Sequence, residues 1–380
     1  MYGSSMPTLT YIGPNGSRPT DGGRLTAELL GRLRQRFDAV TELDFSCGAA
    51  DIEALLADPP THLLLVGTPP QLGSLLSGRL SGLRSGGTLT FGYAFVEDSF
   101  LPAPLAHLPG WFDFFVTSSN IGAAVYRDAI AALPSVNKAL FRAADGIRAI
   151  RPGVDSKTFR PQSSYHFDFD RSELRGSLFG GQVVDSDLLV FVPGPYADLS
   201  DYPEAMATVR QLADKIGRPV RAYFHTESDP DLHLLAAGNE LRDPIFADKL
   251  LAGGLVSDQL LCYLYNAADL VLSCKCADGW PFGLVEAMAS GTLVAAPAEN
   301  CSLEVIDEQR GIELPTVRFD QRCGRPVRHT DPTGNAQVIV AAYSDQSFKE
   351  IRERGVGWAR MDGANSWDAC AASWAALMGR

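Results

Sequence analysis

Short apolar runs alternate with stretches of helical periodicity along the chain, a pattern typical of βαβ units and parallel sheets. The first half predicts strands at LTYIG (9–13), HLLLVG (62–67), TLTFGYA (88–94), FDFFVTS (112–118) and IRAIRP (147–152), and helices at 24–37, 71–83 and 121–132. The second half predicts strands at DLLVFVPG (187–194), RPVRAYFHT (218–226), ADLVLSC (268–274) and TLVAAPA (292–298), and helices at 203–215, 258–267 and 282–289. We therefore expect an α/β fold of two doubly wound domains in series.

The apolar rhythm is interrupted at residues 151–176, where Pro, Gly, Ser and charged residues are frequent. Such a composition is typical of a joint between domains. We expect an N-terminal Rossmann-like domain at 1–160, a C-terminal Rossmann-like domain at 161–350 and a terminal helical segment at 351–380. In this last segment, residues 366–378 have the pattern of an amphipathic helix with Ser366 as its N-cap.

Charge is distributed unevenly along the chain. Residues 1–160 contain 14 Lys and Arg against 14 Asp and Glu, whereas residues 161–380 contain 19 against 31, so the formal net charge of −12 falls in the second half. Nucleic acids are bound by clustered Lys and Arg, and this distribution therefore argues against nucleic acid as the main partner.

The sequence also suggests where the protein is found. No run approaches the roughly 18 apolar residues that span a bilayer, and the N-terminus lacks a basic segment followed by a long apolar one. The seven cysteines are odd in number and scattered, which favours a reducing compartment over a disulfide framework. We therefore expect a soluble, cytoplasmic protein.

The stretch SCKCADGWPFGLVEAMASGTLVAAPAENCSLEVI (273–306) carries the most informative pattern. A strand ends near Cys274, a loop with Asp278 follows, and a helix begins near Phe282. In open α/β sheets such a helix N-terminus presents backbone N–H groups to an anion at the carboxyl ends of the strands. Carboxylates at Asp278 and Glu286 suit the hydroxyl pairs of a sugar and a ribose. The stretch therefore predicts a site for an anionic ligand that also presents sugar and ribose hydroxyls.

This stretch resembles the E-x7-E signature of glycosyltransferase family 4, the retaining nucleotide-sugar enzymes of GT-B fold, in a D-x7-E form. Other segments resemble the family in the same order: TDGGR (20–24), GYAFVEDSFLP (92–102), FDFFVTSSN (112–120), IRPGVDSKTF (150–159) and LVSDQLLCYLYNAADLVLS (255–273). The resemblance implies two Rossmann-like domains facing across a cleft, with the terminal helix returning to the first domain.

On the donor side, the resemblance implies that Glu286 binds the ribose of a nucleoside diphosphate sugar and that Asp278 acts on the donor sugar as a catalytic residue. It also implies that the donor sugar and diphosphate are lined by Gly279, Trp280, Pro281, Phe282, Gly283 and Leu284. No cofactor and no metal are expected in this scheme.

On the acceptor side, the resemblance implies that Gly22 and Gly23 approach the phosphates or the acceptor, although the two glycines also suit a simple helix start. Glu97 matches a catalytic glutamate on the acceptor side, and a capping or solvated carboxylate is the alternative. The expected acceptor is a saccharide, a lipid-linked molecule or another small molecule. The arginines at 24, 32, 34 and 36 suit a solvated helix face better than a peripheral membrane contact.

One feature departs from the family. Its members place an Arg and a Lys after the first strand of the second domain to neutralise the diphosphate, but PGPYADLSDYPEA (193–205) has no basic residue. Lys275 is a candidate substitute, and so is the basic stretch with Arg318, Arg322, Arg325 and Arg328. We expect the nucleotide to depend on a local positive pocket near residues 279–283.

Two further candidates are set aside. His225 and His233 each suit a structural role better than that of a base, and Cys274 and Cys276 alternate on a strand, which argues against a shared metal. The predicted function is transfer of a sugar from a nucleoside diphosphate to an acceptor hydroxyl with retention. The alternatives are a catalytically silent subunit that binds a nucleotide sugar or a partner protein, and, within the enzymes, a GT-B phosphorylase or epimerase.

Overall fold

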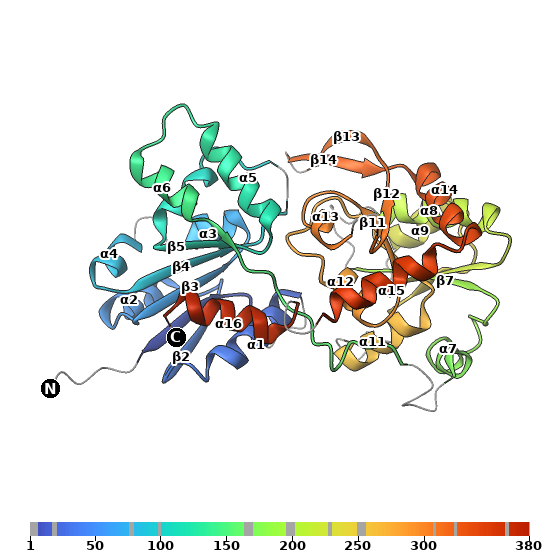
Figure 1. Cartoon of the computed structure of the whole chain (residues 1–380), viewed down its shortest axis with the longest axis horizontal. Coiled ribbons are helices and arrows are strands. Elements are labelled where there is room, and N and C mark those ends of the chain that lie inside the picture. The colour runs from blue at the N-terminus through green and yellow to red at the C-terminus, as the bar shows by residue number, and fades with distance from the viewer. Residues whose placement is uncertain are drawn as a thin grey trace. The chain divides into compact units, whose positions relative to one another are not determined.

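The structure is a computed structural model of the chain, and it describes residues 7–16, 21–75, 80–97, 100–162, 170–194, 202–226, 230–248, 256–306, 309–322, 325–361 and 365–379. The chain divides into two compact units, whose elements are labelled in Figure 1. Unit 1 comprises Met1–Gly153, Asp278–Trp280 and Gly363–Arg380, and unit 2 comprises Val154–Ala277 and Pro281–Asp362.

Unit 1 is built on a six-stranded parallel sheet of order β2-β1-β3-β4-β5-β6. Its strands are β1 (Thr8–Gly13), β2 (Ala39–Asp44), β3 (His62–Gly67), β4 (Leu89–Ala94), β5 (Phe114–Thr117) and β6 (Arg148–Ala149). Its helices are α1 (Asp21–Leu33), α2 (Ala49–Ala57), α3 (Pro69–Leu75), α4 (Leu80–Ser85), the 3-10 helix η1 (Leu105–Trp111), α5 (Asn120–Ala131), α6 (Lys138–Gly146) and α16 (Trp367–Leu377). All six residues of β3 are buried, as expected of a central strand covered on both faces.

Unit 2 is built on a second six-stranded parallel sheet, of order β12-β11-β10-β7-β8-β9, and carries a two-stranded antiparallel hairpin. Its strands are β7 (Leu188–Val192), β8 (Val220–Phe224), β9 (Ile245–Phe246), β10 (Leu270–Leu272), β11 (Leu293–Pro297), β12 (Ile312–Leu314) and the hairpin strands β13 (Thr316–Arg322) and β14 (Arg325–Thr330). Its helices are α7 (Arg171–Phe179), α8 (Tyr202–Lys215), α9 (Pro230–Gly238), α11 (Asp258–Ala267), α12 (Phe282–Ala289), α13 (Ser302–Val305), α14 (Pro332–Ser344) and α15 (Phe348–Ala359).

The expected fold class is confirmed, since both units are parallel sheets with alternating helices. The structure adds elements that the apolar pattern did not indicate, among them β2, β9, β12 and the β13–β14 hairpin. The expected joint at 151–176 contains the boundary between Gly153 and Val154, and it also contains the start of α7. That helix begins at an Asp170 N-cap, whose carboxylate accepts from the Ser172 N–H, and it ends at Gly180 with a φ of 57°.

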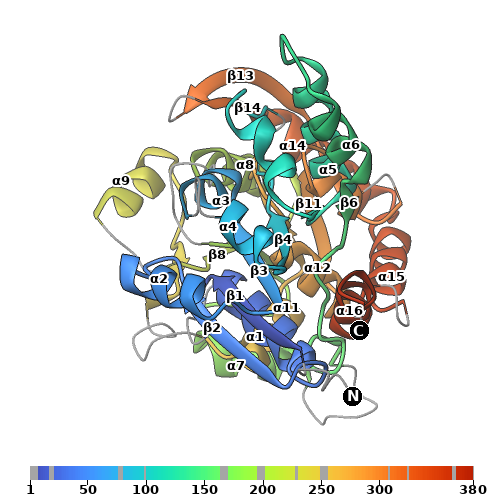
Figure 2. The ribbon, with the colours of Figure 1, turned by 90° about the vertical axis from the view of Figure 1, so that its left-hand side faces the viewer.

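The C-terminal helix α16 packs against α1 in unit 1, and Figure 2 shows the two helices side by side. Ser366 caps α16 as expected, because its hydroxyl accepts from the Ala369 N–H at 3.1 Å. Trp374 is fully buried, with its ring centroid 5.0 Å from that of Tyr93. The helix before it, α15, begins three residues before the expected terminal segment 351–380 and packs against α12 and β11 of unit 2.

Candidate functional site

The carboxyl ends of the parallel strands of unit 2 meet at one edge of the sheet, named the donor edge because the sequence leads us to expect the donor to bind there. The strand order places β7 beside β10, so the connections that leave these neighbouring strands run outward in opposite directions along the sheet. A crevice forms at such a switch point and is where ligands bind in open α/β sheets. The residues that follow the strands there include Pro193 and Gly194 after β7, His225 after β8 and Lys275 after β10.

Gly194 is in very close contact with the end of β8. A Cβ atom added to it would lie 2.1 Å from the carbonyl oxygen of His225 and 2.9 Å from the Tyr202 hydroxyl. The backbone at Gly194, two residues after β7, therefore lies against the backbone at the end of β8, and only glycine leaves room for this approach.

We expect Gly194→Ala to lower the free energy of unfolding of unit 2 by about 2 kcal/mol and to weaken nucleoside diphosphate binding. The reason is that the new methyl group forces the end of β7 away from His225 at the donor edge. Thermal unfolding and calorimetric titration with UDP measure the two effects. Gly176→Ala in α7 is the matched control, since a Cβ there meets no atom within 4 Å. An unchanged free energy of unfolding and an unchanged affinity for UDP in Gly194→Ala would show that this close approach contributes neither to stability nor to binding.

Helix α12 begins at the donor edge directly after the loop that follows β10. Pro281 occupies its N-cap and provides no side-chain hydrogen bond, so the first turn is not capped by a side chain. Its buried residues include Phe282, Leu284 and Glu286. Glu286, in the second turn, is 5% exposed, and one oxygen of its carboxylate lies 3.4 Å from the Tyr265 hydroxyl that donates to it. Gly283 faces the same tyrosine, because a Cβ at this position would lie 3.3 Å from the Tyr265 hydroxyl oxygen.

Two segments that follow strands of unit 2 carry the basic residues expected to bind the diphosphate. Lys275, three residues after β10, is half-buried, and its backbone N–H donates to the Ser273 hydroxyl at 3.4 Å. Arg318, Arg322, Arg325 and Arg328 all lie on the β13–β14 hairpin. The structure describes the side chain of Arg328, which pairs at 3.0 Å with Glu299, a residue two positions after β11. The base of the hairpin thus lies at the carboxyl end of the sheet.

The middle of the D-x7-E segment belongs to unit 1. Ser118, buried after β5, donates to the carbonyl oxygen of Gly279 at 2.5 Å, and a Cβ on Gly279 would lie 2.7 Å from the Cβ of Phe95. The glycine is therefore required by contact with Phe95. Asp278 is half-buried and accepts from the Trp280 N–H at 3.2 Å, which closes a tight turn.

Trp280 itself is 3% exposed. Its indole N–H is buried, and the described residues offer it no hydrogen-bond acceptor. A buried donor without an acceptor typically costs about 1–3 kcal/mol. This unfavourable free energy arises in the three-residue segment Asp278–Trp280, which belongs to unit 1.

These contacts bring the two predicted catalytic residues to one edge of unit 1. Glu97 is half-buried in the segment after β4, two residues beyond the Phe95 that touches Gly279. Asp278 directly precedes Gly279. Both carboxylates therefore lie at the carboxyl end of the unit 1 sheet, near β4 and β5.

The sequence did not indicate Ser118 or Gly194 as site residues, although TSSN after a strand and Pro-Gly-Pro after another are both typical of tight turns.

Gly22 and Gly23 lie in the first turn of α1, which also starts at this end of the sheet. The carbonyl oxygen of Gly22 accepts from the buried Thr26 hydroxyl at 3.0 Å, and the same hydroxyl lies 2.7 Å from the carbonyl oxygen of Pro14. Thr26 thus ties the start of α1 to the segment that follows β1. This geometry gives the two glycines a well-defined position in the turn.

A pocket of about 490 Å³ at the end of β1 and β2 is lined by Glu42, Asp44, Asp51 and Cys47. Burial and the charges of Asp51 and Asp44 raise the pKa of the Cys47 thiol.

In the part of the chain that the structure describes, no group of three or more His, Cys, Asp and Glu side chains is arranged to hold a metal ion. Within the same residues, no helix has the length and apolar character needed to cross a membrane.

The whole chain is similar in structure to solved glycosyltransferases. HepE from Anabaena, in complex with UDP-glucose, superposes with a TM-score of 0.71 over 98% of this chain and 99% of that chain, at 13% sequence identity. Sucrose-phosphate synthase from Thermosynechococcus elongatus gives 0.71 over 98% of both chains at 14% identity. A glycosyltransferase from Rickettsia africae gives 0.67 over 98% of both chains at 13% identity.

No protein-family model matches the chain, and no curated protein matches it significantly. At identities of 13% to 14%, the likeness to the solved structures establishes the fold. Together with the two six-stranded parallel sheets, it shows that the chain has the GT-B fold of these glycosyltransferases.

Proposed function

We propose that the protein is a glycosyltransferase of the family 4 type that transfers a sugar from a nucleoside diphosphate to an acceptor hydroxyl with retention of configuration. The observation that carries this proposal is the placement of the D-x7-E segment. Its helix α12 starts at the donor edge of unit 2, at the switch point between β7 and β10, and holds Glu286. The GT-B fold and the neighbour solved with UDP-glucose support the same assignment.

In this proposal Glu286 accepts hydrogen bonds from the ribose hydroxyls, and the first turn of α12 faces the diphosphate. Uncapped N–H groups and the positive end of the helix dipole both stabilise a phosphate. Lys275 and the hairpin arginines are the basic groups that we assign to the leaving diphosphate. They take the place of the Arg and Lys that 193–205 lacks.

During transfer the bond between the anomeric carbon and the diphosphate oxygen breaks, and a bond from that carbon to the acceptor oxygen forms. The diphosphate gains negative charge as the first bond breaks, so fixed positive groups at the donor edge lower the barrier. Asp278 is assigned to the donor sugar, and Glu97 is assigned to receive the proton of the acceptor hydroxyl. Both lie at the same edge of unit 1, where Gly22 and Gly23 also begin α1.

The proposed scheme uses no metal or other cofactor, and the acceptor is a saccharide, a lipid-linked molecule or another small molecule. We place the activity in the cytoplasm. Six of the seven cysteines are described, and each is a free thiol, five of them buried. Free thiols in this number suit a reducing compartment.

The test is a thermal-shift panel of UDP, GDP and ADP and their glucose derivatives, followed by an assay for nucleoside diphosphate release. A ligand present at a hundred times its Kd stabilises the folded state by about 2.7 kcal/mol. We expect stabilisation by one nucleotide class and release that depends on an added acceptor. No stabilisation by any member of the panel would contradict the donor site. Binding without acceptor-dependent release would favour the catalytically silent subunit.

A further inference from the structure

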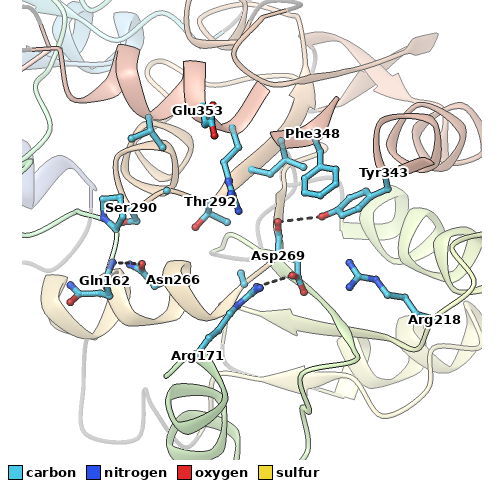
Figure 3. A pocket seen from close by; sticks show the side chains of 16 residues that line it. Gln162, Arg171, Arg218, Asn266, Asp269, Ser290, Thr292, Tyr343, Phe348 and Glu353 are labelled. Carbon is cyan, nitrogen blue, oxygen red and sulfur yellow. Dashed lines mark hydrogen bonds and ion pairs between the residues drawn. The ribbon is translucent and has the colours of Figure 1, made fainter. Parts of the chain in front are cut away.

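A second pocket lies at the opposite edge of the unit 2 sheet from the donor edge, and Figure 3 shows it from close by. It has a volume of about 690 Å³. Asp269, directly before β10, and Thr292, directly before β11, are among its lining residues, so the pocket is at the amino ends of the strands. A five-residue strand such as β11 is about 16 Å long, which separates this pocket from the donor edge.

Three arginines from different elements line this amino-edge pocket: Arg171 at the start of α7, Arg218 before β8 and Arg352 on α15. Figure 3 shows Arg171 and Arg218 on two sides of Asp269. Burial raises the pKa of the Tyr343 hydroxyl, and the positive charges of all three arginines act in the opposite direction. The three guanidinium groups are therefore all close enough to Tyr343 to affect the ionisation of its hydroxyl.

One of the two carboxylates that line the pocket is already paired with arginines. Asp269 accepts from Arg171 Nη2 at 2.8 Å, from the fully buried Arg175 Nη2 at 2.7 Å and from the Leu189 N–H at 2.8 Å. Two guanidinium groups thus face one carboxylate, and Asp269 has little capacity left for the others. Glu353 on α15 is the other acidic residue that lines the pocket.

Arg218 and Arg352 remain available to bind an anion. In the part of unit 2 that the structure describes, neither side chain makes an ion pair, and the guanidinium of Arg218 lies 5.5 Å from the centre of the Tyr343 ring. Positive side chains gathered at one pocket repel one another unless an anion lies among them. The gathering is notable because residues 161–380 hold 19 basic against 31 acidic side chains.

The other walls of the pocket are apolar or carry neutral hydrogen-bonding groups. Leu293, Val356 and Phe348 contribute apolar surface, whereas Gln162 and Ser290 contribute polar groups. A volume of about 690 Å³ is far more than an inorganic phosphate fills, and it suits a small metabolite. Guanidinium groups are the side chains best suited to phosphate oxygens.

We propose that this amino-edge pocket is a binding site for a phosphorylated sugar, with Arg218 and Arg352 holding the phosphate. The site is separate from the donor edge, and the inference does not depend on the proposed transferase activity. Ser290 and Thr292 lie within three residues of the end of α12, whose first turn is at the donor edge. One helix of eight residues therefore borders both places.

The test is calorimetric titration of the full chain with glucose 6-phosphate, inorganic phosphate and glucose at low ionic strength. We expect glucose 6-phosphate to bind, inorganic phosphate to bind more weakly and glucose not to bind. Arg218→Ala and Arg352→Ala should each weaken glucose 6-phosphate binding about tenfold, the loss of one charge-assisted contact. Glu353→Gln should strengthen it, because it removes a negative charge from the pocket wall.

The matched control is Arg242→Ala, which removes an exposed arginine of the same unit that does not line the pocket and should leave binding unchanged. Glucose 6-phosphate that fails to bind the wild-type chain would overturn the proposal. So would equal binding by the Arg218→Ala, Arg352→Ala double variant. Inorganic phosphate that binds as tightly as glucose 6-phosphate would overturn the assignment to a sugar.

Discussion

Gly153→Ala should lower the free energy of unfolding of unit 1 by about 3 kcal/mol, the upper range for an overpacked core position. A Cβ at this position would lie 2.1 Å from the backbone nitrogen of Trp367 and 2.3 Å from the carbonyl carbon of Ser366. Both are backbone atoms at the capped start of α16. The clash therefore cannot be relieved by the movement of a flexible side chain. For a unit of this size the loss corresponds to a fall in Tm of about 10 °C.

The cysteine of α16 reports whether the helix has detached. Burial raises the pKa of the Cys370 thiol to about 12, although the charge of Arg32 acts the other way. At pH 8 this thiol is therefore protonated and shielded in the native chain, and it should resist alkylation. In Gly153→Ala we expect Cys370 to be alkylated at pH 8, as quantified by mass spectrometry of its peptide, because a displaced α16 exposes it.

Gly31→Ala is the control for this experiment. Gly31 lies within α1, the helix against which α16 packs, and a Cβ there meets no atom within 4 Å. Alanine in an exposed helix position should stabilise the chain by about 0.5–1 kcal/mol and leave Cys370 protected. A Gly153→Ala chain with the native Tm and a protected Cys370 would mean that α16 does not depend on this close contact.

Central strands were predictable from the sequence because both of their faces are buried. HLLLVG gives β3 with the predicted bounds, since all six of its residues are buried. AVTELD gives β2, an edge strand whose residues are exposed or half-buried, and such a strand has no continuous apolar run to detect. Helix α7 was missed for a related reason: its charged residues suggested a linker, although Arg175 is buried and paired with Asp269 of a distant element.

The segment that carries the candidate site was predictable in part. The segment between β10 and α12 was located from its order of strand, glycine loop and helix, and α12 has the predicted bounds 282–289. The requirement for glycine at position 279 was not predictable, because it comes from a close contact with Phe95, which is far away in the sequence. The amino-edge pocket was missed as well, because its arginines are brought together by the sheet from positions 171, 218 and 352. Contacts of this kind leave no local signal.

The two carboxylates of the D-x7-E segment should have separable effects on the proposed donor. We expect Glu286→Ala to weaken UDP binding by about 10- to 100-fold, the loss of a charge-assisted hydrogen-bond acceptor for the ribose. Asp278→Ala should leave UDP binding within about threefold but lower kcat for the UDP-sugar by about 100-fold or more, as expected when a group that acts on the reacting sugar is removed. Calorimetric titration with UDP and steady-state kinetics with the UDP-sugar measure the two effects.

Controls separate the role of Glu286 in binding from its role in folding. Glu286 is buried beside Tyr265, so Tyr265→Phe removes the hydroxyl that donates to it at 3.4 Å while keeping the carboxylate. This variant should bind UDP within about fivefold of the native chain, since the long contact contributes little. Glu350→Ala removes a carboxylate that is 76% exposed on α15 and should change neither binding nor turnover.

The pattern across the variants decides the assignment. Stronger loss of UDP binding in Asp278→Ala than in Glu286→Ala would reverse the roles proposed for the two residues. Native binding and native turnover in both variants would remove the D-x7-E segment from the site altogether. Loss of UDP binding in Glu286→Ala with an unchanged Tm, beside a Glu350→Ala chain that binds normally, is the result that follows if α12 holds the nucleotide at the donor edge.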